Sequence, residues 1–125
     1  METLTVLFIE DDRIVRQAWR RELLYRRPDV LILEAESLRE VMQLIVDGNK
    51  FDGALVDGML KEEPDGPAVV SYLRATPETM KVILVAASSA SSSNKEMIDA
   101  GANGTSNSKY QAVSVLLDLL AHGAQ

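Results

Sequence analysis

Two short apolar runs in this sequence end directly in carboxylates, a residue type that binds hard metal ions and can act as a nucleophile. Residues 4–9 are followed by Glu10 and Asp11, and residues 53–56 are followed by Asp57. Carboxylates that lie close together repel one another, so at least one must be protonated unless a cation lies between them. Mg²⁺ suits such a cluster because it takes oxygen ligands and often bridges to a phosphate. A carboxylate supported by Mg²⁺ can also accept a phosphoryl group as a nucleophile.

The same aspartates also have a simpler interpretation, in which they only cap local structure. Asp11 or Asp12 can accept a hydrogen bond from the first turn of a following helix, and Asp57 can do so in a turn. For each aspartate alone, capping is at least as good an explanation as a role in a functional site. Two acidic groups after two different apolar runs favour a site, provided that the fold brings the ends of the runs together.

The apolar runs have the length and composition of buried strands. Residues 4–9, 30–35, 53–56 and 81–86 are rich in aliphatic side chains, and three of these runs are nearly continuous rather than alternating. Such runs are typical of strands covered on both faces in a parallel sheet. We expect a fifth strand within residues 101–108, where only the alternation of the elements supports it.

Segments with helical periodicity separate the predicted strands. The first ends before Pro28. Ser37 and Glu40 form a capping box that begins the second, and Pro67 suits the first turn of the third. These three helices would connect the first four strands.

Two more helices are expected in the second half of the chain. Ser93 and Glu96 predict a capping box for the fourth helix, which would stop near Gly101. Val115 and Leu119 fall off the buried stripe of the fifth helix and are candidates for a partner or dimer surface. That stripe has helical spacing and consists of Val113, Leu116, Leu117 and Leu120.

Strands that alternate with helices imply right-handed crossovers and an α/β fold with a doubly wound sheet. We expect a flavodoxin-like, five-stranded parallel sheet, (βα)5, with strand order 2-1-3-4-5. In such a sheet the first strand lies beside the third, and ligands bind beyond the carboxyl ends of the strands. This order predicts that Glu10 and Asp11 lie next to Asp57.

Length and composition limit the other possibilities. The 125 residues predict one domain spanning residues 1–125, and the lack of cysteine excludes disulfides and thiolate metal sites. We see no secretory signal and no run long enough to cross a membrane, and therefore expect a cytoplasmic protein. The net charge of −6 argues against direct nucleic acid binding.

The stretches VLFIEDDRIVR and ALVDGML, followed by DG, resemble the receiver domain of two-component response regulators over essentially the whole chain. The resemblance implies that Asp57 is the phosphoacceptor and that Glu10 and Asp11 help to hold Mg²⁺. The backbone carbonyl of Met59 would be a further ligand. The implied donor is a histidine kinase or phosphotransfer protein, and the implied target is a downstream protein or a fused output domain. Such a domain signals rather than acting as an enzyme, and it can form a homodimer through its fourth and fifth helices.

The sequence departs from the family pattern at the positions that relay phosphorylation. Ala86 stands where the family has Thr or Ser, and Thr105 stands where an aromatic residue is common. The family's lysine aligns with Ser108, and Lys109 takes the place of the following proline. A one-residue bulge would bring Lys109 into the site; otherwise it points elsewhere, because neighbouring residues of an extended segment face opposite sides. Ser88 reaches the site only if its loop shifts.

Two functions therefore remain open. The retained carboxylates favour a phosphorylatable receiver with an altered relay, whereas the altered positions favour a pseudo-receiver that binds a partner regardless of phosphate. An FMN-binding flavodoxin would need a phosphate loop in place of Glu-Asp-Asp. A haloacid dehalogenase phosphatase would need two aspartates one residue apart. The sequence leaves open whether the receiver stands alone or belongs to a larger protein.

Overall fold

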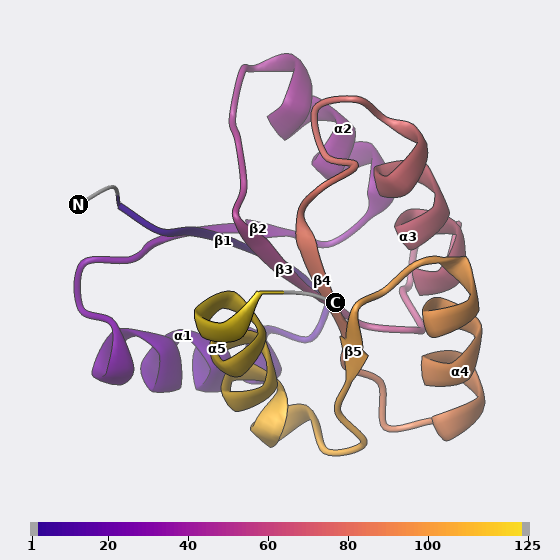
Figure 1. The fold of residues 1–125 in the computed structure, drawn as a ribbon. Coiled ribbons are helices and arrows are strands. Elements are labelled where there is room, and N and C mark those ends of the chain that lie inside the picture. The colour runs from indigo at the N-terminus through magenta and orange to yellow at the C-terminus, as the bar shows by residue number, and fades with distance from the viewer. Residues whose placement is uncertain (1–2, 124–125) are drawn as a thin grey trace.

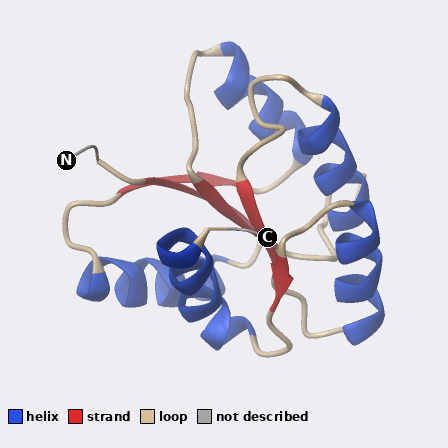
Figure 2. Ribbon diagram, viewed as in Figure 1, coloured by secondary structure: helices blue, strands red, loops and turns tan. Residues whose placement is uncertain are grey.

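The structure, a computed structural model, describes residues 3–123 as one parallel sheet with helices on both faces (Figures 1 and 2). The strands are β1 (Thr5–Ile9), β2 (Leu31–Ala35), β3 (Gly53–Val56), β4 (Ile83–Ala86) and β5 (Gly104–Thr105). The helices are α1 (Arg13–Arg26), α2 (Leu38–Val46), α3 (Gly66–Ala75), α4 (Ser91–Ala100) and α5 (Ala112–His122), with a 3₁₀ turn, η1 (Lys109–Gln111), before α5. The strand order is 2-1-3-4-5, so the predicted flavodoxin-like fold is confirmed.

The two faces of the sheet have separate apolar cores. Helices α1 and α5 cover one face, and α2, α3 and α4 cover the other (Figure 1). Successive residues of a strand point to opposite faces, so Phe8 packs with Trp19 and Leu116 on the first face, while Ile9 packs with Val70 on the second. Aliphatic residues from every strand except the short β5 contribute to both cores. Among residues 3–123, no helix combines the length and the apolar character that crossing a bilayer requires.

The start of α4 differs from the prediction. The helix begins after Ala90, which makes no side-chain cap, so the capping box predicted for Ser93 and Glu96 is wrong. The physical reason is Asn94, which is 3% exposed and pairs with both backbone groups of Ser88, at 2.9 Å and 2.8 Å. These bonds draw the first turn of α4 close to the end of β4. The predicted stop at Gly101 is confirmed.

The fifth strand is present but only two residues long, and it pairs with the end of β4. Leu119 of α5 packs directly over Gly104, where a Cβ atom would lie 2.9 Å from Leu119 Cδ1. Val115 also packs there, and both side chains are half-buried. Less of Val115 and Leu119 is therefore available to a partner than the helical stripe predicts.

Candidate functional site

The ends of β1 and β3 place Glu10 and Asp57 side by side. The last residues of the two strands are paired in register, and Asp57 continues the ladder by donating its backbone N–H to the carbonyl of Ile9 at 2.9 Å. Because side chains alternate along a strand, Glu10 and Asp57 share the face of Phe8 and Leu55. That is the face covered by α1 and α5.

The two aspartates after β1 have different local roles. Asp12 is the N-cap of α1, and its carboxylate accepts a hydrogen bond from the N–H of Ile14 at 2.9 Å. Asp11 instead accepts a hydrogen bond from the backbone N–H of Lys61 at 2.7 Å, which ties the loop after β1 to the loop after β3. The capping interpretation thus holds for Asp12, and Asp11 is left to face the site.

Glu10, Asp11 and Asp57 form the acidic cluster, in which one carboxylate oxygen of each lies within 4.8 Å of the others. Glu10 is fully buried and Asp57 is 4% exposed, so water screens their charges poorly. Oxygen donors at this spacing fit a single hard cation of the Mg²⁺ type. The cluster borders an open cavity of about 570 Å³, which Met59 also lines. Ligands can therefore reach the carboxylates from solvent.

Lys109 is a cation that the protein itself brings to the acidic cluster. Its ammonium nitrogen lies 2.8 Å from Glu10 Oε1 and 3.3 Å from Asp57 Oδ2. Strand β5 ends at Thr105, and Lys109 begins the turn η1, so the alternation of an extended strand does not apply to it. The structure therefore shows the alternative in which Lys109 enters the site.

The other altered switch positions differ in burial. Ala86 is fully buried at the end of β4 next to Thr105 and presents only a methyl group. Thr105 and Ser108 are exposed. Ser88 does line the same cavity, and its Oγ accepts a hydrogen bond from the N–H of Ala90 at 3.1 Å. The site thus has a lysine and a nearby hydroxyl, but both come from positions other than those of the family pattern.

Comparison with known proteins decides which family the chain belongs to. The family model for the response regulator receiver domain matches residues 6–118. The chain belongs to this family. Receiver domains are signalling domains that typically bind Mg²⁺ at an acidic cluster. A search of curated proteins found no match.

Several solved receivers share the fold. A putative response regulator from Chloroflexus aurantiacus J-10-fl is 24% identical, with 96% of this chain and 99% of that chain covered and a TM-score of 0.77. The phosphorylated cyanobacterial phytochrome response regulator RcpA is 16% identical, with 97% and 91% covered and a TM-score of 0.77. The Mn²⁺-bound form of response regulator Rcp1 is 13% identical, with 98% and 95% covered and a TM-score of 0.74.

Burial shifts the pKa of one carboxyl group in this receiver's acidic cluster, that of Glu10. It raises the pKa of Glu10 to about 7, an effect that the hydrogen bond from Lys109 opposes and that Asp57 reinforces. Burial also lowers the pKa of Lys109, but its hydrogen bond and charge interaction with Glu10, together with Asp57, outweigh this, and the pKa is raised above its ordinary value. Lys109 therefore remains charged while Glu10 titrates near neutral pH.

Replacing Glu10 with glutamine is expected to stabilise the metal-free receiver at alkaline pH but not in acid. The pKa of Glu10 is about 7 in the folded chain, against 4.5 for an ordinary glutamate, so the folded state holds the proton more tightly. The protonated Glu10 side chain therefore contributes its full stability below the unfolded-state pKa, and this contribution is lost as pH rises through the folded-state pKa. Urea unfolding at about pH 5 and about pH 8, with a chelator present, should show Glu10→Gln gaining on wild type. If the free energies of unfolding of wild type and Glu10→Gln changed equally between the two pH values, the raised pKa of Glu10 would be contradicted.

Two residues of this receiver site could not be identified from the sequence. Trp19 is 1% exposed, and its indole N–H donates to the backbone carbonyl of Lys109 at 2.7 Å. Asn94 bonds the backbone of Ser88 and also approaches the carbonyl of Ser106 at 3.4 Å. The apolar spacing of α1 predicts that Trp19 is buried, but it does not show where the indole N–H points. Nothing in the stretch at residues 88–94 distinguishes Asn94 from its polar neighbours.

Proposed function

We propose that this receiver accepts a phosphoryl group on Asp57 from the phosphohistidine of a histidine kinase or phosphotransfer protein. The observation that carries the proposal is the meeting of three carboxylates and one ammonium at the carboxyl ends of β1 and β3. Asp57 is held there by the sheet, next to an open cavity. A nucleophile, a cation site and a positive side chain thus lie within reach of one incoming phosphoryl group.

In the proposed site, Glu10, Asp11, Asp57 and the backbone carbonyl of Met59 would hold Mg²⁺. Bound Mg²⁺ would neutralise charge on the oxygens of the incoming phosphoryl group. The donor set fits, because Mg²⁺ takes hard oxygen ligands and keeps several waters. The fold neighbours RcpA and Rcp1 were solved phosphorylated and with Mn²⁺ bound, respectively. These structures support the proposed phosphorylation and the proposed binding of a divalent cation.

The bonds that form and break in the proposed transfer belong to Asp57 and the phosphodonor. A carboxylate oxygen of Asp57 attacks the phosphorus, the bond from phosphorus to the donor's imidazole nitrogen breaks, and that nitrogen keeps the electron pair. The product is an acyl phosphate on Asp57. Lys109, 3.3 Å from Asp57 Oδ2, is placed to donate to a phosphoryl oxygen, a charge-assisted contact worth about 1.5–3 kcal/mol.

The experiment that tests this proposal is intact mass spectrometry after incubation with phosphoramidate or acetyl phosphate and Mg²⁺. Wild type should gain one phosphoryl group, and Asp57→Asn should gain none, because the amide nitrogen is not a nucleophile under these conditions. Asp12→Asn is the matched control, since Asp12 is occupied in capping α1, and it should still gain the group. A phosphorylated Asp57→Asn protein would place the acceptor elsewhere.

The second candidate function is a pseudo-receiver, an interaction module that binds its partner regardless of phosphate. The observation in its favour is Ala86, which has no hydroxyl to follow a phosphoryl group, next to Thr105, which has no ring. Absence of both a mass increase and Mg²⁺ binding in wild type would favour this alternative. A mass increase that leaves partner binding unchanged would show an acceptor without a relay.

The proposed partners follow from the family. They are the phosphodonor, a downstream protein or a fused output domain in the cytoplasm, and a second copy of the receiver through α4 and α5. Direct nucleic acid binding by this domain is not proposed, because the chain carries a net charge of −6.

A further inference from the structure

We propose that Trp19 is a positioning residue that holds Lys109 in the acidic cluster and thereby couples helix α1 to the state of the site. The consequence for signalling depends on the function proposed above, whereas the positioning itself does not. The inference comes from one buried hydrogen bond and from the short strand that precedes it.

The indole of Trp19 is held by packing against Phe8 and by one hydrogen bond. Its ring is 1% exposed and meets Phe8 edge-on, with the ring centroids 5.4 Å apart and the planes at 70°. The only donor of the ring, Nε1–H, points at the carbonyl of Lys109 at 2.7 Å. A buried indole N–H that lost this partner would pay the desolvation cost of an unsatisfied donor. The bond therefore restrains the position of the Lys109 backbone.

Lys109 is held at both ends. Trp19 binds its carbonyl oxygen, and Glu10 and Asp57 bind its ammonium group. The same carbonyl accepts the backbone N–H of Ala112 as α5 begins. Lys109 is thus the side chain through which a change at the carboxylates is transmitted to the turn η1 and to α1.

The receiver needs such a restraint because β5 ends four residues before Lys109. In a longer strand, the ladder of hydrogen bonds would determine which side chain points into the site. Here Ser106 still donates its backbone N–H to the carbonyl of Ala86 at 2.8 Å, but residues 107 and 108 are not paired with a strand, so contacts from other elements orient the turn. The indole of Trp19 supplies that contact from α1, which is 90 residues away in sequence.

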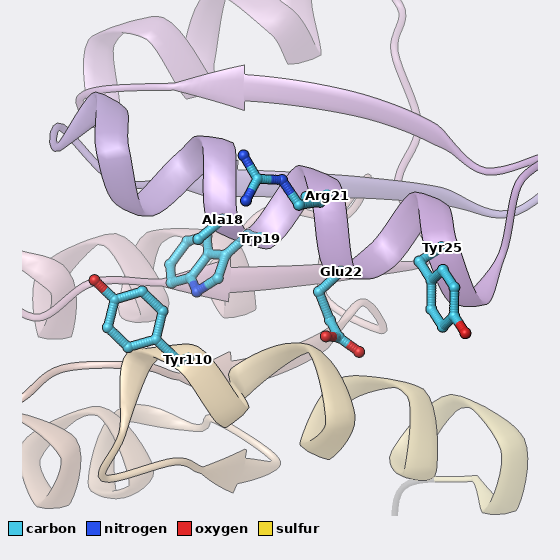
Figure 3. Close-up of a pocket in the computed structure, with 6 residues that line it drawn as sticks. All are labelled: Ala18, Trp19, Arg21, Glu22, Tyr25 and Tyr110. Carbon is cyan, nitrogen blue, oxygen red and sulfur yellow. The ribbon is translucent and has the colours of Figure 1, made fainter.

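The restraint also reaches the surface. Trp19 and Tyr110 both line a cavity of about 380 Å³ between α1 and the turn η1 (Figure 3). Tyr110 follows Lys109 directly and is 66% exposed. A displacement of the Lys109 backbone would shift Tyr110 as well, because the two residues are consecutive, and would change the shape of this cavity. The route bypasses Ala86 and Thr105, which lack the groups used in the family pattern.

The first experiment measures how reactive the amine of Lys109 is in Trp19→Phe. Phenylalanine keeps an aromatic ring but has no N–H, so the turn is released and the ammonium is less firmly held. Brief acetylation followed by peptide mass spectrometry should show labelling at Lys109 rising about 3- to 10-fold, the value of one lost hydrogen bond. Exposed Lys95 is the internal reference and should not change.

A control variant separates this role from a purely structural one. Val113→Ala removes buried apolar contact from the same core and leaves the indole N–H intact. It should lose stability without any change in the labelling of Lys109. Equal labelling of Lys109 in wild type and Trp19→Phe, or an equal rise in Val113→Ala, would overturn the proposal.

A second measurement needs no substitution of Trp19. The chain has one tryptophan, so the indole N–H gives one resonance in an NMR spectrum. In Lys109→Met, which frees the side chain from Glu10 and Asp57, that N–H should exchange with solvent several-fold faster than in wild type. Unchanged exchange would show that the two ends of Lys109 are not coupled, and would also overturn the proposal.

The link to signalling is tested with phosphoramidate and Mg²⁺. Trp19→Phe should slow phosphorylation of Asp57 in the wild-type background and have no further effect in Lys109→Met, because it acts through Lys109. If wild type takes no phosphoryl group, the proposed function fails while the labelling and exchange results still decide the positioning role. If wild type is phosphorylated and Trp19→Phe has the same effect with and without Lys109, the coupling is refuted.

Discussion

Replacing Lys109 with methionine is expected to tighten Mg²⁺ binding about 10- to 100-fold and at the same time to slow phosphorylation of Asp57. The two effects have one cause. The ammonium of Lys109 now occupies Glu10 Oε1 and Asp57 Oδ2, at 2.8 Å and 3.3 Å, so a metal ion must displace it. The same ammonium is placed to donate to the transferring phosphoryl group. Methionine has a similar reach and no charge.

The matched control for this variant is Lys61→Met. Lys61 lines the same cavity and is exposed, and its hydrogen bond to Asp11 comes from the backbone N–H. Losing its positive charge should therefore alter Mg²⁺ affinity much less. Calorimetric titration with Mg²⁺ and the rate of mass increase with phosphoramidate measure the two effects. Unchanged or weaker Mg²⁺ binding in Lys109→Met would show that Lys109 does not occupy the carboxylates in solution.

Replacing Arg74 with alanine is expected to destabilise the receiver by about 3–5 kcal/mol. The guanidinium of Arg74 joins α3 to two loops, the one before β4 and the one between α4 and β5. It donates to the carbonyls of Met80 and Val82 at 2.9 Å and 2.7 Å, to the carbonyl of Gly101 at 2.9 Å, and to Asn103 Oδ1 at 2.7 Å. Removing it leaves several partly buried acceptors without a partner.

Urea unfolding of Arg74→Ala at neutral pH measures this effect. Arg39→Ala is the control, because Arg39 is exposed and its ion pair is with Glu62 at 3.2 Å, a surface contact worth about 0–1 kcal/mol. Arg74 lies away from the acidic cluster, so the folded variant should still be phosphorylated at Asp57. A loss as small as that of Arg39→Ala would show that water or backbone movement replaces the four bonds.

The sequence by itself determined the parts of this receiver that depend on local periodicity. Apolar runs separated by helical segments predicted the doubly wound parallel sheet, the flavodoxin-like strand order was expected for it, and β3 has the predicted bounds, Gly53–Val56. Carboxylates placed directly after the first and third runs then meet, because these two central strands are neighbours and end on the same side of the sheet. Glu10, Asp11 and Asp57 could be identified as a cluster for this reason.

Only the tertiary structure decided what the loops do. The division of roles between Asp11 and Asp12 depends on Lys61 from another loop. Lys109 enters the site from a turn whose backbone accepts a hydrogen bond from Trp19, which is distant in sequence. Side-chain direction in a strand follows from its period of two, whereas in a loop it follows from contacts with other elements. No local pattern at residues 106–109 contains that information.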